Sequence, residues 1–303
     1  MKCLKILVLL ICCVLIPLSL ASCKDTKPEA VEHDTYTLYQ NYDYGKDERH
    51  IFDLALPKDA CGDIGLIFLI HGGGWHAGDK EVYLSELEKW AERGYAAAAL
   101  NYRYASKKLH NDDILDDIDA CLKAVKALGE ECGVNITSAI LSGGSAGGHL
   151  SLIYAYSRAD GAAITPVAVV SYAGPTDLAD ENFYKESILL EDIEKMITKI
   201  SGTAATAEEY EANRDALLAA SPISYAKSGV PTVICHGTDD IVVPVSNAYT
   251  LDKLLTENGV EHELVIYENS GHGLEADPDA AARSDELFLS YAEKYLKKFT
   301  KEN

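Results

Sequence analysis

The sequence is poor in basic residues and in the patterns that hold metals, nucleotides or nucleic acids. Its 303 residues include 27 lysines and arginines against 48 aspartates and glutamates, so the formal net charge at pH 7 is −21. A body this acidic repels nucleic acid and anionic surfaces, which excludes nucleic acid as a partner. There is no zinc-ligand spacing, phosphate loop or dinucleotide fingerprint, so we expect neither a bound metal nor a cofactor.

Only four cysteines remain outside the first 23 residues, namely Cys61, Cys121, Cys132 and Cys235. Cys121 and Cys132 fall near the two ends of one predicted helix, about 16 Å apart at 1.5 Å per residue. That separation is too large for a disulfide. We therefore expect buried free thiols, and a disulfide between Cys61 and another cysteine remains open.

The first residues have the features of an export signal. Lys2 and Lys5 precede an apolar stretch at 6–20, which is short for a membrane span. The stretch ends in Leu20–Cys23, which resembles the lipobox of bacterial lipoproteins. This predicts a signal peptide at 1–22, lipidation of Cys23, a polar tether at 23–33 and a cell-envelope protein anchored to the membrane by lipid alone. An ordinary secretory signal, with release of the protein, is the alternative.

The remainder predicts one α/β domain at 34–303. Two opening strands are followed by strands that alternate with amphipathic helices, which is typical of a mostly parallel sheet flanked by helices. From about 179 to 221 this rhythm breaks, and an acidic segment of high helical propensity predicts a small helical insertion after the sixth strand. The eight predicted strands are 36–41, 51–56, 64–70, 95–100, 136–141, 167–171, 230–235 and 263–267.

A nucleophile elbow is predicted where the fifth strand ends. Gly143–Gly147 has the Gly-x-Ser-x-Gly pattern between an apolar run and a helix-like run. Such a turn holds the serine in a strained conformation with its hydroxyl at the tip. The two outer glycines are needed because side chains there would collide with the neighbouring strand or helix. Ser145 is therefore the candidate nucleophile.

A serine nucleophile needs a base and a group that orients the base. His272 follows the last strand between two glycines, and Asp240 follows the strand before it. Because the carboxyl ends of parallel strands meet at one edge of a sheet, both side chains can converge on Ser145. Asp239 competes with Asp240 for the acid role, but the position of Asp240 in the run that starts at His236 favours it.

The loop that follows the third strand has the sequence His71–Trp75, with three consecutive glycines. Backbone N–H groups of Gly73 and Gly74, with that of Ala146 after the nucleophile, are candidates for an oxyanion hole. Glycine lets the backbone approach a substrate closely. Trp75 fits either a substrate pocket or a lid over the core, and the sequence does not separate these two interpretations.

These motifs together resemble the α/β-hydrolase superfamily, and within it the carboxylesterases of the hormone-sensitive-lipase and acetyl-xylan or feruloyl esterase kind. The resemblance implies Ser145 as nucleophile, His272 as base and Asp240 as acid, in the chain order of that superfamily. One departure is Leu274, where relatives often have an aromatic residue. The motifs that carry the resemblance are 71–75, 143–150, 174–178, 236–240, 243–244 and 271–273.

The sequence thus predicts a serine esterase that forms an acyl-enzyme. The resemblance favours short acyl, acetyl or feruloyl esters, small or attached to plant polysaccharide. Two alternatives are an exopeptidase of the prolyl-oligopeptidase-like branch and a non-catalytic ligand-binding lipoprotein on a hydrolase scaffold. The sequence does not indicate an oligomeric state.

Overall fold

The computed structural model describes residues 29–185 and 189–300. The predicted signal peptide, Cys23 and the first part of the tether lie outside the described residues. The described residues form one sheet whose strands are β1 (Glu29–Glu32), β2 (Tyr36–Asp43), β3 (Ile51–Pro57), β4 (Gly62–Ile70), β5 (Ala96–Leu100), β6 (Val134–Gly144), β7 (Thr165–Tyr172), β8 (Thr232–Gly237) and β9 (His262–Tyr267).

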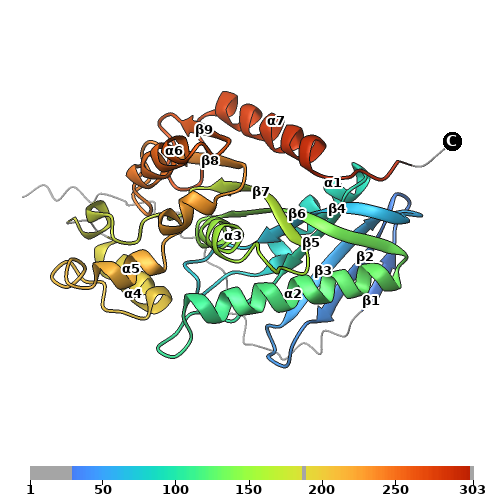
Figure 1. Cartoon of the computed structure of the whole chain (residues 1–303), viewed down its shortest axis with the longest axis horizontal. Helices are drawn as coiled ribbons and strands as arrows, with labels where there is room; N and C mark the ends of the chain where they lie inside the picture. The colour runs from blue at the N-terminus through green and yellow to red at the C-terminus, as the bar shows by residue number, and fades with distance from the viewer. Residues whose placement is uncertain (1–28, 186–188, 301–303) are drawn as a thin grey trace, which may run out of the picture.

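The sheet has the order β1-β2-β3-β5-β4-β6-β7-β8-β9. The first three strands and β5 pair antiparallel, whereas every pairing from β5 to β9 is parallel. The prediction of a mostly parallel α/β sheet is therefore confirmed, with all eight predicted strands present. Because β4, β6, β8 and β9 run parallel, their carboxyl ends lie at the same end of the sheet (Figure 1). The predicted site residues follow these carboxyl ends.

A ninth strand, β1, corrects the prediction of eight strands and of a tether that extends to residue 33. Residues 29–32 pair antiparallel with β2, for example Val31 with Leu38. This edge strand is mostly exposed and buries little apolar surface, so its sequence lacks the alternating pattern of a half-buried strand. What holds β1 in place is backbone hydrogen bonding to β2, whose outer edge offers free N–H and C=O groups.

Helices cover both faces of the sheet (Figure 1). The helices α1 (Leu84–Glu92) and α7 (Pro278–Tyr295) pack on one face, and α2 (Asn111–Glu131), α3 (Ala146–Ser157) and α6 (Ser246–Asn258) pack on the other. Asp277 caps α7, since its side chain accepts a hydrogen bond from the Ala280 N–H. Among the described residues, no helix combines the length and the apolar character needed to cross a membrane.

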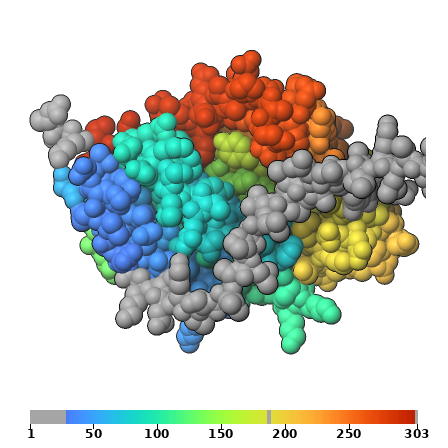
Figure 2. Space-filling view, turned by 180° about the vertical axis from the view of Figure 1, so that it is seen from behind, coloured from blue at the N-terminus to red at the C-terminus, as the bar shows by residue number. Residues whose placement is uncertain are grey.

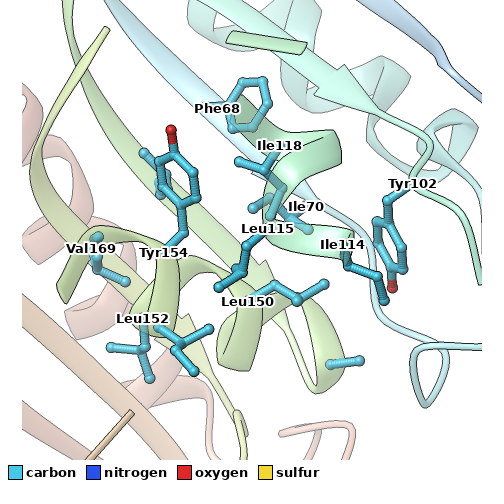
Figure 3. Packing of buried hydrophobic residues seen from close by; sticks show 14 of the residues in the cluster. Phe68, Ile70, Tyr102, Ile114, Leu115, Ile118, Leu150, Leu152, Tyr154 and Val169 are labelled. Carbon is cyan, nitrogen blue, oxygen red and sulfur yellow. The ribbon is translucent and has the colours of Figure 1, made fainter. Parts of the chain in front are cut away.

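Alternate residues of β4 face the two cores. Phe68 and Ile70 belong to the cluster under α2 and α3, whereas Ile67 and Leu69 belong to the cluster under α1 and α7. A strand buried on both faces therefore reads as a continuous apolar run. Figure 3 shows the first cluster, in which Ile114, Leu115 and Ile118 of α2 meet Phe68, Ile70 and Leu150.

The predicted helical insertion is present between β7 and β8. It contains α4 (Leu190–Ser201) and α5 (Arg214–Ala219), which lie together at one end of the molecule (Figure 1). Apolar residues of α4 recur at helical spacing, and Ile193, Ile197 and Ile200 are buried. The insertion thus presents an apolar face to the rest of the domain.

The four cysteines within the described residues are all free thiols, as predicted. Burial holds only for Cys121 and Cys235; Cys132 is half-buried and Cys61 is exposed. The expectation of four buried thiols is therefore wrong for Cys61 and for the half-buried Cys132. Cys61 lies between β3 and β4, in a connection that has no core to cover it.

Candidate active site

Ser145 lies between the end of β6 and the start of α3. Its backbone has φ 54° and ψ −124°, a region that residues with a side chain rarely adopt. The glycines on either side make this turn feasible, because a Cβ atom at Gly143 or Gly147 would overlap the carbonyl oxygen of Ile70. The predicted elbow is thus present, and close packing against β4 explains its glycines.

Asp240 and His272 lie in contact, as the sequence predicts. The distance from His272 Nδ1 to Asp240 Oδ2 is 2.8 Å. The other carboxylate oxygen accepts hydrogen bonds from the backbone N–H groups of Val242 and Val243, at 2.8 and 2.9 Å. Asp239 is exposed, and it is Asp240 that the structure brings to the histidine.

The environment of Asp240 favours its ionised form. Burial alone would raise the pKa of Asp240, but hydrogen bonds from His236 and His272 outweigh it and hold the pKa well below the usual range. Of the two, His272 is the closer donor, because His236 Nε2 lies 3.4 Å from the carboxylate and 2.9 Å from the Val243 carbonyl. An ionised carboxylate only accepts, so His272 Nδ1 donates and Nε2 remains the basic nitrogen.

The glycine loop after β4 packs directly against the elbow. Gly73 and Gly74 have φ values of 109° and 58°, which favour glycine. A Cβ atom at Gly72 would lie 2.8 Å from the Gly144 carbonyl oxygen, and one at Gly74 would overlap the Met196 sulfur. Ala146, the first residue of α3, is buried, and the first N–H groups of a helix have no partner within the helix.

Trp75 combines both roles that the sequence left open, because its side chain is buried and also lines the cavity beside Ser145. Its indole N–H donates to His149 Nδ1 at 3.2 Å. The other ring nitrogen of His149 therefore carries the proton and donates to the Ala220 carbonyl at 2.8 Å. Burial lowers the pKa of His149 to about 4, so this ring is neutral at pH 7. His149 thereby links the glycine loop to the insertion.

We expect His149→Leu to destabilise the fold by about 2–4 kcal/mol, because it leaves the buried Trp75 N–H and Ala220 carbonyl without partners. Urea unfolding measures the effect as a lower transition midpoint. His149→Asn offers both a donor and an acceptor and should lose less. Equal midpoints for His149→Leu and the parent chain would contradict this linking role.

Arg49 is a residue of the site region that the sequence analysis missed. Its Nη2 lies 3.2 Å from His71 Nε2, and its Nε donates to the Tyr102 carbonyl at 2.8 Å. Arginine only donates, so His71 Nε2 accepts and His71 Nδ1 donates to the Gly72 carbonyl at 2.7 Å. Burial, with a smaller effect of Arg49, lowers the pKa of His71 to about 4. These contacts hold the start of the glycine loop in place, and no sequence pattern predicts them.

Ser145 and His272 line the same cavity, which has a volume of about 310 Å³. Its other walls are almost entirely apolar. The insertion supplies four of them, Phe183, Ile193, Met196 and Ile197, whose place in the site the sequence does not indicate. The complete set of these other walls is Gly73, Gly74, Trp75, Pro175, Phe183, Ile193, Met196, Ile197, Val242 and Val243.

LipM, a probable carboxylic ester hydrolase of Mycobacterium tuberculosis, is 32% identical over 200 residues, which cover 63% of this chain and 44% of LipM. The chain spans about half the length of LipM and of a second relative, a probable isoprenylcysteine alpha-carbonyl methylesterase of Oryza sativa, of which the match covers 56%.

Two solved structures share the fold. Esterase B of Lactobacillus rhamnosis superposes with a TM-score of 0.68 at 18% identity, over 86% of each chain. A truncated carbohydrate esterase from gut microbiota superposes with a TM-score of 0.69 at 21% identity, over 86% of this chain and 99% of that one. The α/β-hydrolase fold that the resemblance implied is therefore confirmed.

One protein-family model, BD-FAE, matches residues 52–255. The match includes the glycine loop, the elbow with Ser145, and Asp240, while His272 lies beyond it. It covers about two thirds of the 303 residues, and the chain therefore belongs to the BD-FAE family.

Proposed function

We propose that the chain is a serine hydrolase that cleaves carboxylic esters through an acyl-enzyme. One observation carries this proposal: Ser145 at a strained elbow and His272, held by Asp240 at 2.8 Å, line one cavity. The family and the esterases that resemble the chain support the same reaction. The arrangement has the three parts that acyl transfer needs, namely a nucleophile, a base and an orienting acid.

In the proposed reaction, Ser145 Oγ attacks the ester carbonyl carbon while His272 Nε2 takes the hydroxyl proton. Asp240 accepts the Nδ1 hydrogen bond throughout and stabilises the imidazolium that forms. The tetrahedral intermediate collapses as His272 gives its proton to the departing alcohol oxygen, which leaves an acyl group on Ser145. Water, activated by the same histidine, then releases the acid and restores the serine.

The negative oxygen of the intermediate needs hydrogen-bond donors that are already in place. We propose the backbone N–H groups of Gly73, Gly74 and Ala146 for this role. Both glycines line the cavity with Ser145, and Ala146 begins the helix that follows it. Loss of one such donor costs on the order of 100- to 1000-fold in rate.

The cavity limits the acyl group that can be bound. Its volume of about 310 Å³ is at the small end of ligand sites, and its walls are apolar. Short-chain or aromatic acyl groups, such as acetyl and feruloyl, fit these walls, and plant polysaccharide is a candidate alcohol. A carbohydrate esterase among the structural relatives supports this substrate class.

Reaction with a fluorophosphonate probe tests the proposal. The full chain should be labelled at Ser145, located by peptide mass spectrometry, because an activated serine attacks the phosphorus centre. Prior heat denaturation should abolish labelling. A folded chain that stays unlabelled would instead indicate a ligand-binding protein on a hydrolase scaffold.

We further propose that the protein is exported and anchored to the cell envelope through lipid on Cys23. The support lies in the sequence, where Leu20–Cys23 follows a basic start and an apolar stretch. Expression in a bacterial host with an alkyne fatty acid should label the full chain and leave Cys23→Ser unlabelled. Equal labelling of both chains, or of neither, would contradict the anchor.

A further inference from the structure

Ser145 borders a second cavity besides the apolar one. This second cavity has a volume of about 440 Å³, and Ser145 and His272 line both. The apolar cavity extends under the insertion, toward Phe183 and Met196, whereas the second one extends toward Tyr172 and Tyr267. The nucleophile thus lies where two spaces of different chemistry meet.

The second cavity continues into a third, with a volume of about 760 Å³. Tyr172, Tyr267 and Ala281 line both of them, so the two form one groove that leads from Ser145 to α1 and α7. In Figure 2 the green residues of the sheet are visible between the teal segment that holds α1 and the red segment that holds α7. We name this space the tyrosine groove, defined by Tyr172, Tyr267, Ala281 and the α1 and α7 residues beyond them.

The lining of the tyrosine groove is rich in donors and acceptors. Tyr267 and Ser284 belong to its wall, and their buried hydroxyls are hydrogen-bonded to each other at 2.5 Å. Its far part carries charges of both signs, including a Glu86–Lys89 ion pair at 2.5 Å and the guanidinium of Arg93. With Asp285 and Glu286, the lining holds three acidic and two basic side chains. Such a mixture of donors and acceptors suits a neutral ligand with many hydroxyls, whereas the apolar cavity has only Ser145 and His272 as titratable or hydroxyl groups.

We propose that the tyrosine groove binds the alcohol portion of the ester, and that this portion is a neutral, hydroxyl-rich chain of sugar units. The inference rests on the proposed function and assigns the two sides of its site. The acyl group occupies the apolar cavity between Trp75 and α4. The alcohol runs past Tyr172 and Tyr267 toward α1 and α7.

The geometry of acyl transfer supports this assignment. When the carbonyl oxygen points to the glycine loop, the two other substituents of the carbonyl carbon must diverge from Ser145. The departing alcohol oxygen has to lie beside His272, which gives it a proton. His272 lines both cavities, so an alcohol protonated there can leave along either one, and the polar lining of the tyrosine groove is what favours a hydroxyl-rich alcohol on that side. The alcohol part of a methyl ester is a single methyl group, which would leave the groove empty.

Steady-state kinetics with a fixed butyryl group test the assignment without any variant. Methyl butyrate is compared with xylotriose that carries one butyryl ester. Contacts beyond the reacting atoms lower KM, and we expect a KM for the trisaccharide ester that is on the order of tenfold lower. Equal or higher KM values for the trisaccharide ester would overturn the proposal.

Ala281→Trp then narrows the groove where its two parts join. The ratio of kcat/KM for the trisaccharide ester to that for methyl butyrate should fall on the order of tenfold. Ala282→Trp is the matched control, because Ala282 is the next residue of α7 and is exposed to solvent. An unchanged ratio in Ala281→Trp, or the same fall in both variants, would overturn the proposal that the tyrosine groove binds the alcohol.

Met196→Trp fills the opposite cavity and should change the preference among methyl esters of increasing acyl length. If Met196→Trp instead alters the alcohol preference and Ala281→Trp the acyl preference, the assignment is reversed and the proposal is wrong. Failure of the proposed function is distinct from these results. In that case no ester is hydrolysed and the fluorophosphonate does not label Ser145.

Discussion

Ser145→Ala should lower kcat for p-nitrophenyl acetate on the order of 10⁶-fold. In the proposed mechanism the substitution removes the atom that forms the acyl-enzyme, so what remains is the contribution of the oxyanion donors and of binding. KM should change little, because the methyl group of alanine leaves the walls of the cavity intact. Initial rates at saturating ester, with enzyme concentrations raised to compensate, measure the loss.

The fold should survive this change. Alanine meets the same positive φ of 54° that serine meets, so the elbow is no more strained than before. Ser151→Ala is a suitable control, since Ser151 is a buried serine of α3, the helix that follows Ser145, and its hydroxyl donates to the Gly147 carbonyl at 2.8 Å. It should keep its rate within a few-fold. Turnover by a folded Ser145→Ala chain would remove Ser145 from the mechanism.

Much of the fold could be predicted because parallel strands and amphipathic helices leave strong patterns. The run at 64–70 is apolar throughout because β4 is covered on both faces, and α2 has one apolar face that meets it. The edge strand β1 left no such pattern, since an exposed edge is held by backbone hydrogen bonds that do not depend on side chains.

The candidate site also has a part that the sequence pattern predicts and a part that it does not. That Ser145, Asp240 and His272 lie near one another was predictable because each follows a strand, and the carboxyl ends of parallel strands lie together. The support of the glycine loop was not. Arg49 comes from the connection between β2 and β3, and its contact with His71 depends on how β3 and the loop after β4 pack in three dimensions.

The cavity walls were also beyond the sequence. The segment at 179–221 is visibly an insertion, but Ile193 and Met196 become walls only through the angle at which α4 docks. Helical periodicity indicates which face is apolar and not which cavity that face closes. The tyrosine groove has the same origin, because Tyr172, Tyr267 and Ala281 come from three elements that share no motif.

Asp240→Asn should lower kcat/KM on the order of 10⁴-fold, as expected when the orienting acid of a histidine base is neutralised. Asp240 Oδ1 accepts from the Val242 and Val243 N–H groups, and Oδ2 accepts from His272. The asparagine carbonyl takes the two backbone donors, so its amide N–H₂ faces His272 Nδ1. An amide that donates there forces the proton to Nε2, where the imidazole cannot accept the serine proton.

Asp240→Asn also changes how stability depends on pH. The folded pKa of Asp240 lies below its unfolded value, so the stability it contributes is present above about pH 4 and is lost as pH falls through the folded pKa. The free energy of unfolding, measured by circular dichroism at a series of acidic pH values, should therefore fall less steeply with decreasing pH in the variant. Persistence of the same slope would show that other carboxylates dominate acid unfolding.

Asp239→Asn is the matched control for the kinetic loss, because Asp239 precedes Asp240 in the same turn and is exposed. The sequence allowed either residue as the acid, whereas the 2.8 Å contact to His272 belongs to Asp240. We expect Asp239→Asn to keep kcat/KM within a few-fold, since it alters neither the tautomer nor the position of the imidazole. If the two variants lost activity equally, the imidazole would be positioned by the turn as a whole; if only Asp239→Asn lost it, the acid would be Asp239.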